Sequence, residues 1–271
     1  MVSGFDDVSL SSYDEGQLPT FPDLAGRHVF ITGGGSGIGA YFTAAFARQG
    51  ARVSFVGLRE DGIEHTVRII EEQSGKHPFF TYCDIRDIDA LADSIEAAVA
   101  ENGPVDVLIN NAARDTRHSI ESMSSSQWDD AIGVNLKAQH FAAKHVTGGM
   151  KAGGRGAIIN VGSNSANLGL EGFPAYVTAK AAIVGLTRAL ARELGPDNIR
   201  ANCLVPGWVL TERQKKLWAS EEAINDCVEQ QCLKRPLNGW DMVGPALFLA
   251  SDASGAMSGQ QVVVDGGRFL L

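Results

Sequence analysis

The chain has 271 residues, of which 44% are hydrophobic and 20% charged, and its formal net charge is −9. This length and composition are typical of one soluble α/β domain with a well-buried core. The negative charge argues against nucleic acid or an anionic membrane surface as a partner, and we expect neither a membrane span nor a secretory signal.

The four cysteines (Cys83, Cys203, Cys227 and Cys232) show no C-x-x-C spacing. We interpret them as reduced, mostly buried thiols of a cytoplasmic protein, and we expect neither a disulfide framework nor a metal site.

Residues 1–24 are rich in Ser, Asp, Gly and Pro without periodicity, which predicts a surface arm before a domain over 25–271. The domain opens with a short β-rich run, then a glycine turn (G-G-G-S-G-I-G-A) and a helical segment. This strand–turn–helix order is typical of a dinucleotide site. Gly33 would allow the tight turn, Gly37 the approach of a pyrophosphate, and Gly39 the close packing of helix on sheet. The phosphates would lie at the amino terminus of the helix.

A second strand, R-V-S-F-V, ends at Gly57-Leu58-Arg59. An acidic residue here would bind the 2′-hydroxyl of NAD, whereas an arginine accommodates the 2′-phosphate of NADP. Gly57 and Arg59 favour NADP, although Arg59 could equally be an exposed helix-start residue, and Glu60 and Asp61 oppose a phosphate.

Two further strands end in polar residues. The third runs into Asp84-Ile85, a carboxylate and an apolar side chain that suit the edge and face of an adenine. The fourth ends at Asn110-Asn111-Ala112-Ala113, where small residues and amides can lie against the ribose. A simple turn cap is the alternative for one of the two asparagines.

The catalytic candidates follow. Asn135 lies inside a predicted helix, where an amide is unfavourable unless it bonds a backbone carbonyl or water. Ser163 closes the apolar strand G-A-I-I-N-V-G-S, and Tyr176 and Lys180 stand four residues apart, on one face of the next helix. A nearby ammonium is expected to lower the pKa of the tyrosine and make it a proton shuttle. Y-x-x-x-K alone is a weak signal, since an amphipathic helix with a lysine on its wet side gives the same pattern.

A sixth strand ends at Pro206-Gly207, and residues 208–239 are polar and weakly patterned, which predicts a mobile substrate lid. A last helix and strand close the chain. The β–α alternation predicts a single-domain Rossmann fold: a doubly wound parallel sheet of about seven strands with helices on both faces.

The motifs T-G-G-G-S-G-I-G at 32–39, N-N-A-A at 110–113, Y-x-x-x-K at 176–180 and P-G-x-x-x-T at 206–211, with Asn135 and Ser163, resemble those of the short-chain dehydrogenase/reductase family. Ala113 stands where that family usually has glycine. The resemblance implies that Tyr176 is the acid–base, Lys180 lowers its pKa and binds the nicotinamide ribose, Ser163 holds the substrate oxygen, and Asn135 anchors a relay water. It implies cofactor contacts from Gly33, Gly35, Ser36, Gly37, Ile38, Gly39, Leu58, Arg59, Asp84, Ile85, Asn111, Ala112, Ala113, Tyr176, Lys180, Pro206, Gly207, Val209 and Thr211.

Further segments, including A-L-A-R-E-L-G-P-D-N-I-R at 189–200 and T-E-R-Q-K-K-L-W at 211–218, resemble bacterial aldose 1-dehydrogenases of the D-xylose and L-arabinose type. The resemblance implies hydride transfer from C1 of a free aldose, giving a lactone, in a homotetramer. The alternatives are a short-chain enzyme for a polyol, steroid or ketoacyl substrate, and a non-catalytic nucleotide sensor. Substrate contacts are expected from Ser163, Asn164, Glu171, Tyr176, Trp208, Arg114 and His118, with Arg117, Asn167 and Gln214 as further candidates.

Overall fold

The computed structural model of the chain describes residues 18–58 and 60–270. Within them, seven parallel strands form one sheet in the order β3-β2-β1-β4-β5-β6-β7, as the sequence predicts. The order reverses between β1 and β4, and in such sheets ligands bind at this point, outside the carboxyl ends of the strands. The strands are β1 (His28–Thr32), β2 (Arg52–Gly57), β3 (Phe79–Tyr82), β4 (Val107–Asn110), β5 (Gly156–Val161), β6 (Ile199–Pro206) and β7 (Gln261–Val264).

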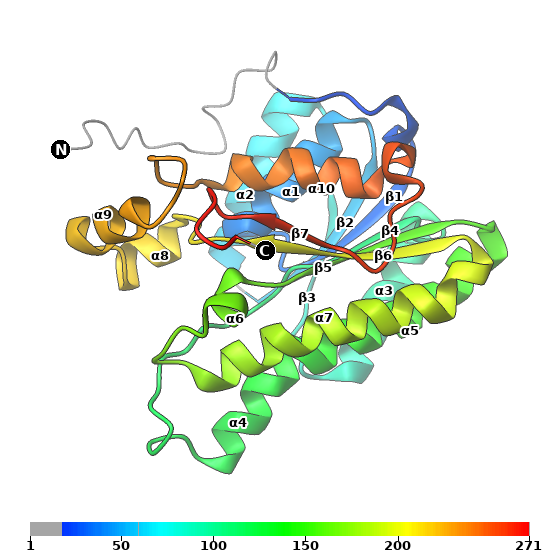
Figure 1. Ribbon diagram of the computed structural model, residues 1–271. Coiled ribbons are helices and arrows are strands. Elements are labelled where there is room, and N and C mark those ends of the chain that lie inside the picture. The colour runs from blue at the N-terminus through cyan, green and yellow to red at the C-terminus, as the bar shows by residue number, and fades with distance from the viewer. Residues whose placement is uncertain (1–17, 59, 271) are drawn as a thin grey trace.

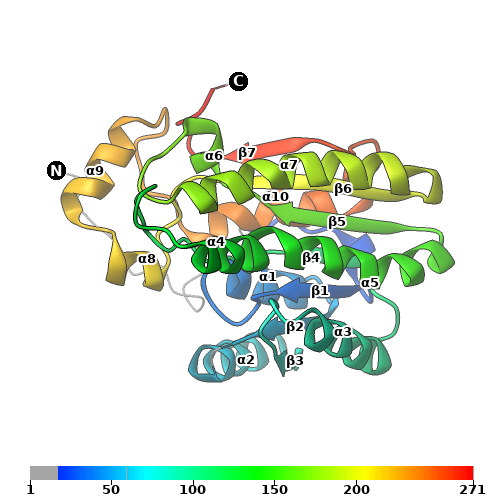
Figure 2. The same ribbon diagram turned by 90° about the horizontal axis from the view of Figure 1, so that it is seen from below.

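Helices cover both faces of the sheet (Figures 1 and 2). On one face lie α1 (Gly37–Arg48), α2 (Glu60–Ser74) and α10 (Val243–Ala250), and their apolar side chains share a core with Phe55 and Ile31. On the other lie α3 (Ile88–Asn102), α5 (Ala138–Gly153) and α7 (Pro174–Leu194), around a core that includes Phe30 and Leu108. Neighbouring residues of β1 thus enter opposite cores, which is the expected alternation of a strand buried on both faces.

The helix predicted to pass through Asn135 is interrupted. α4 (Ser125–Ile132) begins at a capping box formed by Ser124 and Gln127. It ends in a π-helical turn, Gly133–Lys137, before α5 begins. Such π turns are frequent at functional sites, and this one contains Asn135.

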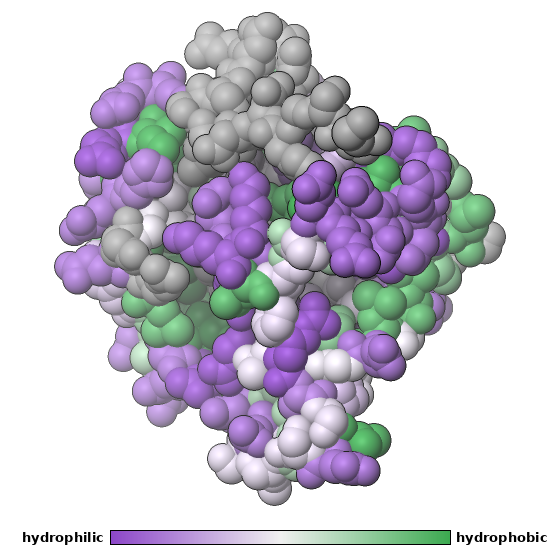
Figure 3. Space-filling view, turned by 90° about the vertical axis from the view of Figure 1, so that its left-hand side faces the viewer, coloured by the Kyte–Doolittle hydropathy of each residue, from purple (hydrophilic) through white to green (hydrophobic). Residues whose placement is uncertain are grey.

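Three short helices gather at the carboxyl ends of the strands: α6 (Asn164–Leu168), α8 (Glu212–Leu217) and α9 (Glu221–Glu229). α8 and α9 project beyond the sheet at the left of Figure 1. Figure 3 views the molecule from this end, where hydrophilic side chains predominate. The remaining short turns of helix are Pro22–Leu24, Gly195–Asp197, Gly239–Met242 and Asp252–Ser254.

The predicted arm divides into two parts. Residues 1–17 lie outside the described residues, whereas residues 18–24 lie against the domain. Leu24 is buried in the first core, and the backbone N–H of Phe21 donates to Oε1 of Gln49 at 2.8 Å. Among the described residues, none of the helices is long and apolar enough to cross a membrane.

Candidate active site

The glycine turn after β1 packs tightly against the start of α1. Gly33 has a φ of 71°, a left-handed conformation that favours glycine. A Cβ on Gly39 would lie 2.0 Å from the carbonyl oxygen of Gly33, so only glycine lets α1 approach the turn this closely. α1 therefore begins directly at the carboxyl end of β1. Its first N–H groups are placed to bind an anion, as the predicted pyrophosphate requires.

Asn111 connects this turn to β4. Its Nδ2 donates to the carbonyls of Thr32 and Gly33 at 3.1 and 3.2 Å. The Thr32 hydroxyl in turn accepts the backbone N–H groups of Asn111 and Ala112 at 3.0 and 3.1 Å. Asn110, by contrast, is buried and donates to Asn160 at 2.9 Å. One asparagine thus fixes the nucleotide loop and the other ties the central strands together.

The end of β2 and the start of α2 would face the adenosine ribose. Leu58 is largely exposed there, and a Cβ on Gly57 would lie 2.9 Å from Cδ1 of Ile63, the tip of a flexible side chain. Arg59, on which the NADP preference partly depends, lies outside the described residues.

The two residues predicted to contact the adenine, Asp84 and Ile85, lie just beyond the end of β3. Arg86 binds the Asp84 carboxylate, with Nε 3.0 Å from Oδ1, and this hydrogen bond lowers the pKa of Asp84. The Ile85 side chain is buried in the second core, and the residue lies beyond the end of β3. Its contact with the adenine stays a prediction. Arg114 lies near this charged group too: its Nη2 is 3.9 Å from Oδ2 of Asp130, and its charge also lowers the pKa of Asp84. Contact of Arg114 with substrate stays a prediction.

Ser163, Tyr176 and Lys180 come together as predicted from their spacing. Ser163 lies two residues after β5 and is the N-cap of α6. Its hydroxyl acts on the Tyr176 phenol, where it lowers the pKa of Tyr176, and lies 2.8 Å from the hydroxyl of Ser165. Lys180 is 1% exposed, donates from Nζ to the carbonyl of Val161 at 2.7 Å, and lies 5.5 Å from the centre of the Tyr176 ring.

The pKa values of this pair differ from the sequence-based expectation. Burial raises the pKa of Tyr176 to about 12, although the hydrogen bond from Ser163 opposes the rise. Burial lowers the pKa of Lys180 to about 8. The prediction that Lys180 lowers the tyrosine pKa is therefore wrong for the protein alone: desolvation of the phenolate dominates, and the cations that oppose it are Arg117 and Arg213.

The side chain of Asn135 makes three hydrogen bonds to the protein backbone. Its Oδ1 accepts the N–H of Arg114 at 2.9 Å, and its Nδ2 donates to the carbonyls of Arg114 and Ala131 at 3.0 and 2.9 Å. The buried amide thus fixes the loop that follows β4, which agrees with the expected backbone bond. The relay water stays a prediction.

The residues predicted to contact substrate lie in different surroundings. Trp208 donates from Nε1 to Oε1 of Gln214 at 3.0 Å, at the base of α8. Thr211 caps α8, and its Cγ2 lies 3.6 Å from where a Cβ on Gly37 would stand, beside the nucleotide turn. Asn164 is buried and donates to Asp265 at 3.1 Å, and Glu171 is exposed. The Nδ2 group of Asn164 is thus engaged inside the protein, and contact of this residue with substrate stays a prediction.

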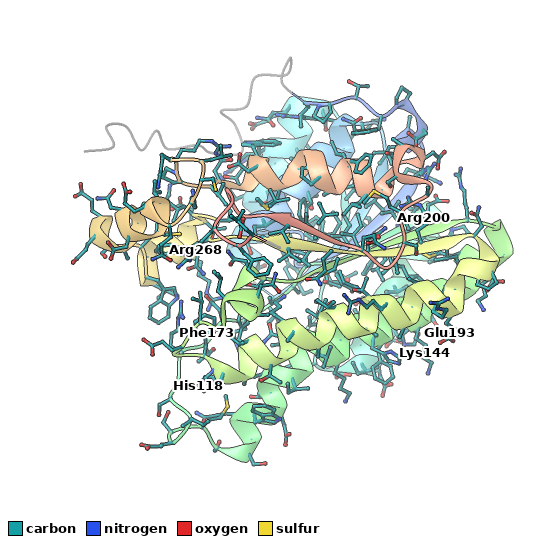
Figure 4. All side chains as sticks on the ribbon, in the orientation of Figure 1. His118, Lys144, Phe173, Glu193, Arg200 and Arg268 are labelled. Atoms are coloured by element: carbon teal, nitrogen blue, oxygen red, sulfur yellow. The ribbon has the colours of Figure 1, made fainter. Side chains whose placement is uncertain are left out.

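The loop between β4 and α4 meets the beginning of α7 (Figure 4). The backbone N–H of His118 donates to Gly172 at 2.8 Å, and its Nε2 accepts the N–H of Ala175 at 3.3 Å. The Arg117 guanidinium lies 3.8 Å from the centre of the Phe173 ring, which is itself 5.4 Å from the Tyr176 ring. His118 and Arg117 are thus close to the candidate tyrosine.

Sequence reasoning missed the acid at the centre of this loop. Asp115 accepts from Nε2 of Gln214 at 2.8 Å and pairs with Arg213 at 3.0 Å, and Arg117 also lies 5.1 Å from the Trp218 ring. These contacts join segments about a hundred positions apart, so no local pattern could reveal them. Within the described residues, His, Cys and carboxylate side chains form no group of three or more that could hold a metal ion.

Comparisons with known proteins agree with this geometry. The family profile described as Enoyl-(Acyl carrier protein) reductase matches residues 33–268. The chain therefore belongs to the short-chain dehydrogenase/reductase family.

Among its relatives are sugar dehydrogenases. It is 48% identical to the "Probable galactose dehydrogenase GalD" of Rhizobium meliloti, over 92% of this chain and 97% of the relative. It is 46% identical to the D-xylose 1-dehydrogenase of Caulobacter vibrioides, over 91% and 97%. A solved structure from Beutenbergia cavernae, named "putative NAD(P) dependent gluconate 5-dehydrogenase" and containing NADP at low occupancy, is 36% identical. It has a TM-score of 0.84 and covers 91% of this chain and 98% of that one.

Proposed function

We propose that the protein oxidises C1 of a free pentose or hexose, passing hydride to NAD(P) and giving the aldonolactone. The observation that carries this proposal is the Ser163–Tyr176–Lys180 group in a chain that is 46–48% identical, over nearly its whole length, to galactose and D-xylose 1-dehydrogenases. D-xylose, D-galactose and L-arabinose are the first substrates to test.

The glycine turn fits a dinucleotide. Only glycine is tolerated where α1 meets Gly33, and Thr211 and Gly37 approach each other where pyrophosphate and nicotinamide would adjoin. When bound, the nicotinamide supplies the hydride acceptor. Lys180 of α7, Asn111 after β4 and Thr211 at the start of α8 would hold it.

The protein's own residues move the proton. The Ser163 hydroxyl would donate to the anomeric oxygen and hold it beside Tyr176. The Tyr176 oxygen would accept the hydroxyl proton as hydride leaves C1. Because burial raises the pKa of Tyr176 to about 12, tyrosinate is scarce at neutral pH in the protein alone. Oxidation is therefore expected to accelerate as pH rises.

A panel of free aldoses with each cofactor tests the proposal. Reduced nicotinamide should accumulate, and alkali should be consumed as the lactone hydrolyses to the aldonic acid. A ketose product consumes no alkali, which separates aldose oxidation from polyol oxidation. Activity on steroids, polyols or ketoacyl substrates, with none on any aldose, would support the alternative within the family.

For the cofactor, we propose a preference for NADP, supported by the glycine at position 57 and the NADP-containing relative. Gly57→Asp would place a carboxylate beside the ribose and should move the ratio of kcat/KM toward NAD. An unchanged ratio would show that Gly57 does not face the ribose.

For assembly, we propose a cytoplasmic homotetramer. Its support is the family resemblance, the four free cysteines, and the exposed Ile120 and Trp128 beside α4 and α7. Light scattering on the purified protein tests the stoichiometry, and Ile120→Lys should weaken assembly if this surface is an interface.

A further inference from the structure

In the loop after β4, the segment that carries Asp115 is held on both sides. Asn135 binds both the N–H and the carbonyl of the preceding residue, Arg114. Three residues beyond Asp115, His118 is bound to Gly172 and Ala175 at the start of the tyrosine helix. The loop therefore crosses from the nucleotide side to α7 with Asp115 between two anchored points.

The carboxylate is enclosed but its hydrogen-bonding capacity is not exhausted. The Asp115 side chain is 13% exposed. Oδ2 accepts from Gln214, whereas Oδ1 is buried and receives no hydrogen bond from the described residues, its contact being the ion pair with Arg213. An ionised carboxylate offers about four acceptor positions. The Asp115 carboxylate can thus accept additional hydroxyl donors, and a buried charge without its full set of donors is costly.

Asp115 is also close to the reacting groups. Its charge acts on both Tyr176 and Lys180, raising the pKa of each, although burial is the larger effect on both. Because the negative charge of Asp115 disfavours tyrosinate, Asp115 does not assist Tyr176 as a base. Its location near the reacting groups suits the binding of substrate instead.

Resting on the proposed function, we propose that Asp115 is a specificity-determining residue for the sugar. Its carboxylate, positioned by Arg213 and Gln214 of α8, accepts hydrogen bonds from ring hydroxyls of the aldose other than the reacting one. A site that hydrogen-bonds a substrate hydroxyl discriminates strongly against analogues that lack it.

A cycle of enzyme and substrate variants tests this directly. kcat/KM is measured for wild type and Asp115→Asn with D-xylose or D-galactose, whichever reacts faster, and with each of its monodeoxy analogues. In wild type, removing the hydroxyl that Asp115 binds should cost about 10- to 100-fold in kcat/KM. In Asp115→Asn that same removal should cost much less, while the other deoxy sugars behave alike in both proteins.

Matched variants separate binding from anchoring. Glu212→Gln makes the same chemical change at an exposed carboxylate of α8, which pairs with Lys215 at 3.2 Å, and should leave every sugar unaffected. Arg213→Met removes the partner and keeps the carboxylate. It should lower kcat/KM without removing the dependence on the particular hydroxyl.

The outcomes are distinct. A uniform loss for all sugars in Asp115→Asn, reproduced by Arg213→Met, would mean that Asp115 only anchors α8, and would overturn the inference. Nucleotide affinity of each variant, followed by tryptophan fluorescence, reports whether the variant is folded. Asp115→Glu keeps the charge and should alter the ranking of the sugars by kcat/KM. Loss of nucleotide binding in both Asp115→Asn and Asp115→Glu would show a purely structural role. If no aldose reacts with the wild-type protein, the proposed function itself fails.

Discussion

The nucleotide side and the substrate side of the cleft are built in different ways. Around the glycine turn, backbone groups meet backbone groups and glycines, as where Gly39 faces the carbonyl of Gly33. Around Asp115, side chains from distant segments meet one another, as in its contacts with Arg213 and Gln214. A backbone-built site tolerates few substitutions at its close contacts, whereas a side-chain-built site can be altered to suit another substrate. The four predictions below test this division, from the largest expected effect on catalysis to the smallest.

Tyr176 lies between the nucleotide side and the substrate side, and we expect its hydroxyl to serve catalysis and not the binding of the nucleotide. Tyr176→Phe removes only the phenolic oxygen, so kcat should fall by ~10²–10⁴-fold while nucleotide affinity is unchanged. Tyr41→Phe, a ring that packs 5.1 Å from Trp240 away from the catalytic group, is the control. Retention of more than about a tenth of kcat in Tyr176→Phe would rule it out as the base.

Gly39→Ala should damage the backbone-built side. The added methyl would meet the Gly33 carbonyl at 2.0 Å, so the turn must open, at a cost of about 1–3 kcal/mol in stability. Nucleotide affinity should fall with it. Gly148→Ala, where nothing lies within 4 Å of the new methyl, should be neutral or slightly stabilising. Equal nucleotide affinity in both variants would contradict the close-contact argument.

Lys180 provides a pH test of burial. Its pKa is about 8 in the folded protein against 10.5 ordinarily, so between these values the unfolded chain binds more protons and stability rises with pH. Relative to Lys180→Met, wild type should gain about 3 kcal/mol between pH 7 and pH 10.5. Calorimetric melting without nucleotide, at matched pH values, measures the difference. Parallel melting curves across that range would mean that Lys180 is not desolvated.

The smallest effect is expected at the edge of the substrate side. Trp218→Ala removes the ring that lies 5.1 Å from the Arg117 guanidinium. A partly exposed cation–π contact contributes about 0.5–1 kcal/mol, so KM for the sugar should rise a few-fold with kcat nearly constant. Leu217→Ala, an exposed neighbour on α8, should not change KM. A large fall in kcat would show that Trp218 supports the hydride-transfer step itself and does more than enclose the substrate.

The same division explains what could be predicted from the sequence. Strands, helices and the glycine turn can be predicted from short segments, because alternation, helical periodicity and turn glycines each determine the conformation of only a few residues. The predicted Rossmann sheet and the meeting of Ser163, Tyr176 and Lys180 are confirmed for that reason. The π turn at Asn135 has no such local signature and was missed.

Side-chain partners were harder to predict. Asn164 and Arg114 are predicted to contact substrate from their positions in loops, which do not reveal that Asn164 donates to Asp265 or that Arg114 lies near Asp130. Each partner comes from a distant element, so competition among polar groups decides where an amide or guanidinium points. Asp115 was overlooked for the same reason.

The anchoring of α9 has a kinetic consequence. Arg268, beyond β7, donates to Gln230 at 3.0 and 2.7 Å and lies beside α9 in Figure 4. The lid over 208–239 stays a prediction, but its two helices are held by different groups. α9 is bound to Arg268, whereas α8 is bound to the loop after β4 through the contacts of Gln214 and Arg213 with Asp115. Any opening of α8 would have to break both the ion pair of Asp115 with Arg213 and its hydrogen bond with Gln214. If such an opening limits product release, the release rate would be set by the rupture of these contacts and would respond weakly to solvent viscosity.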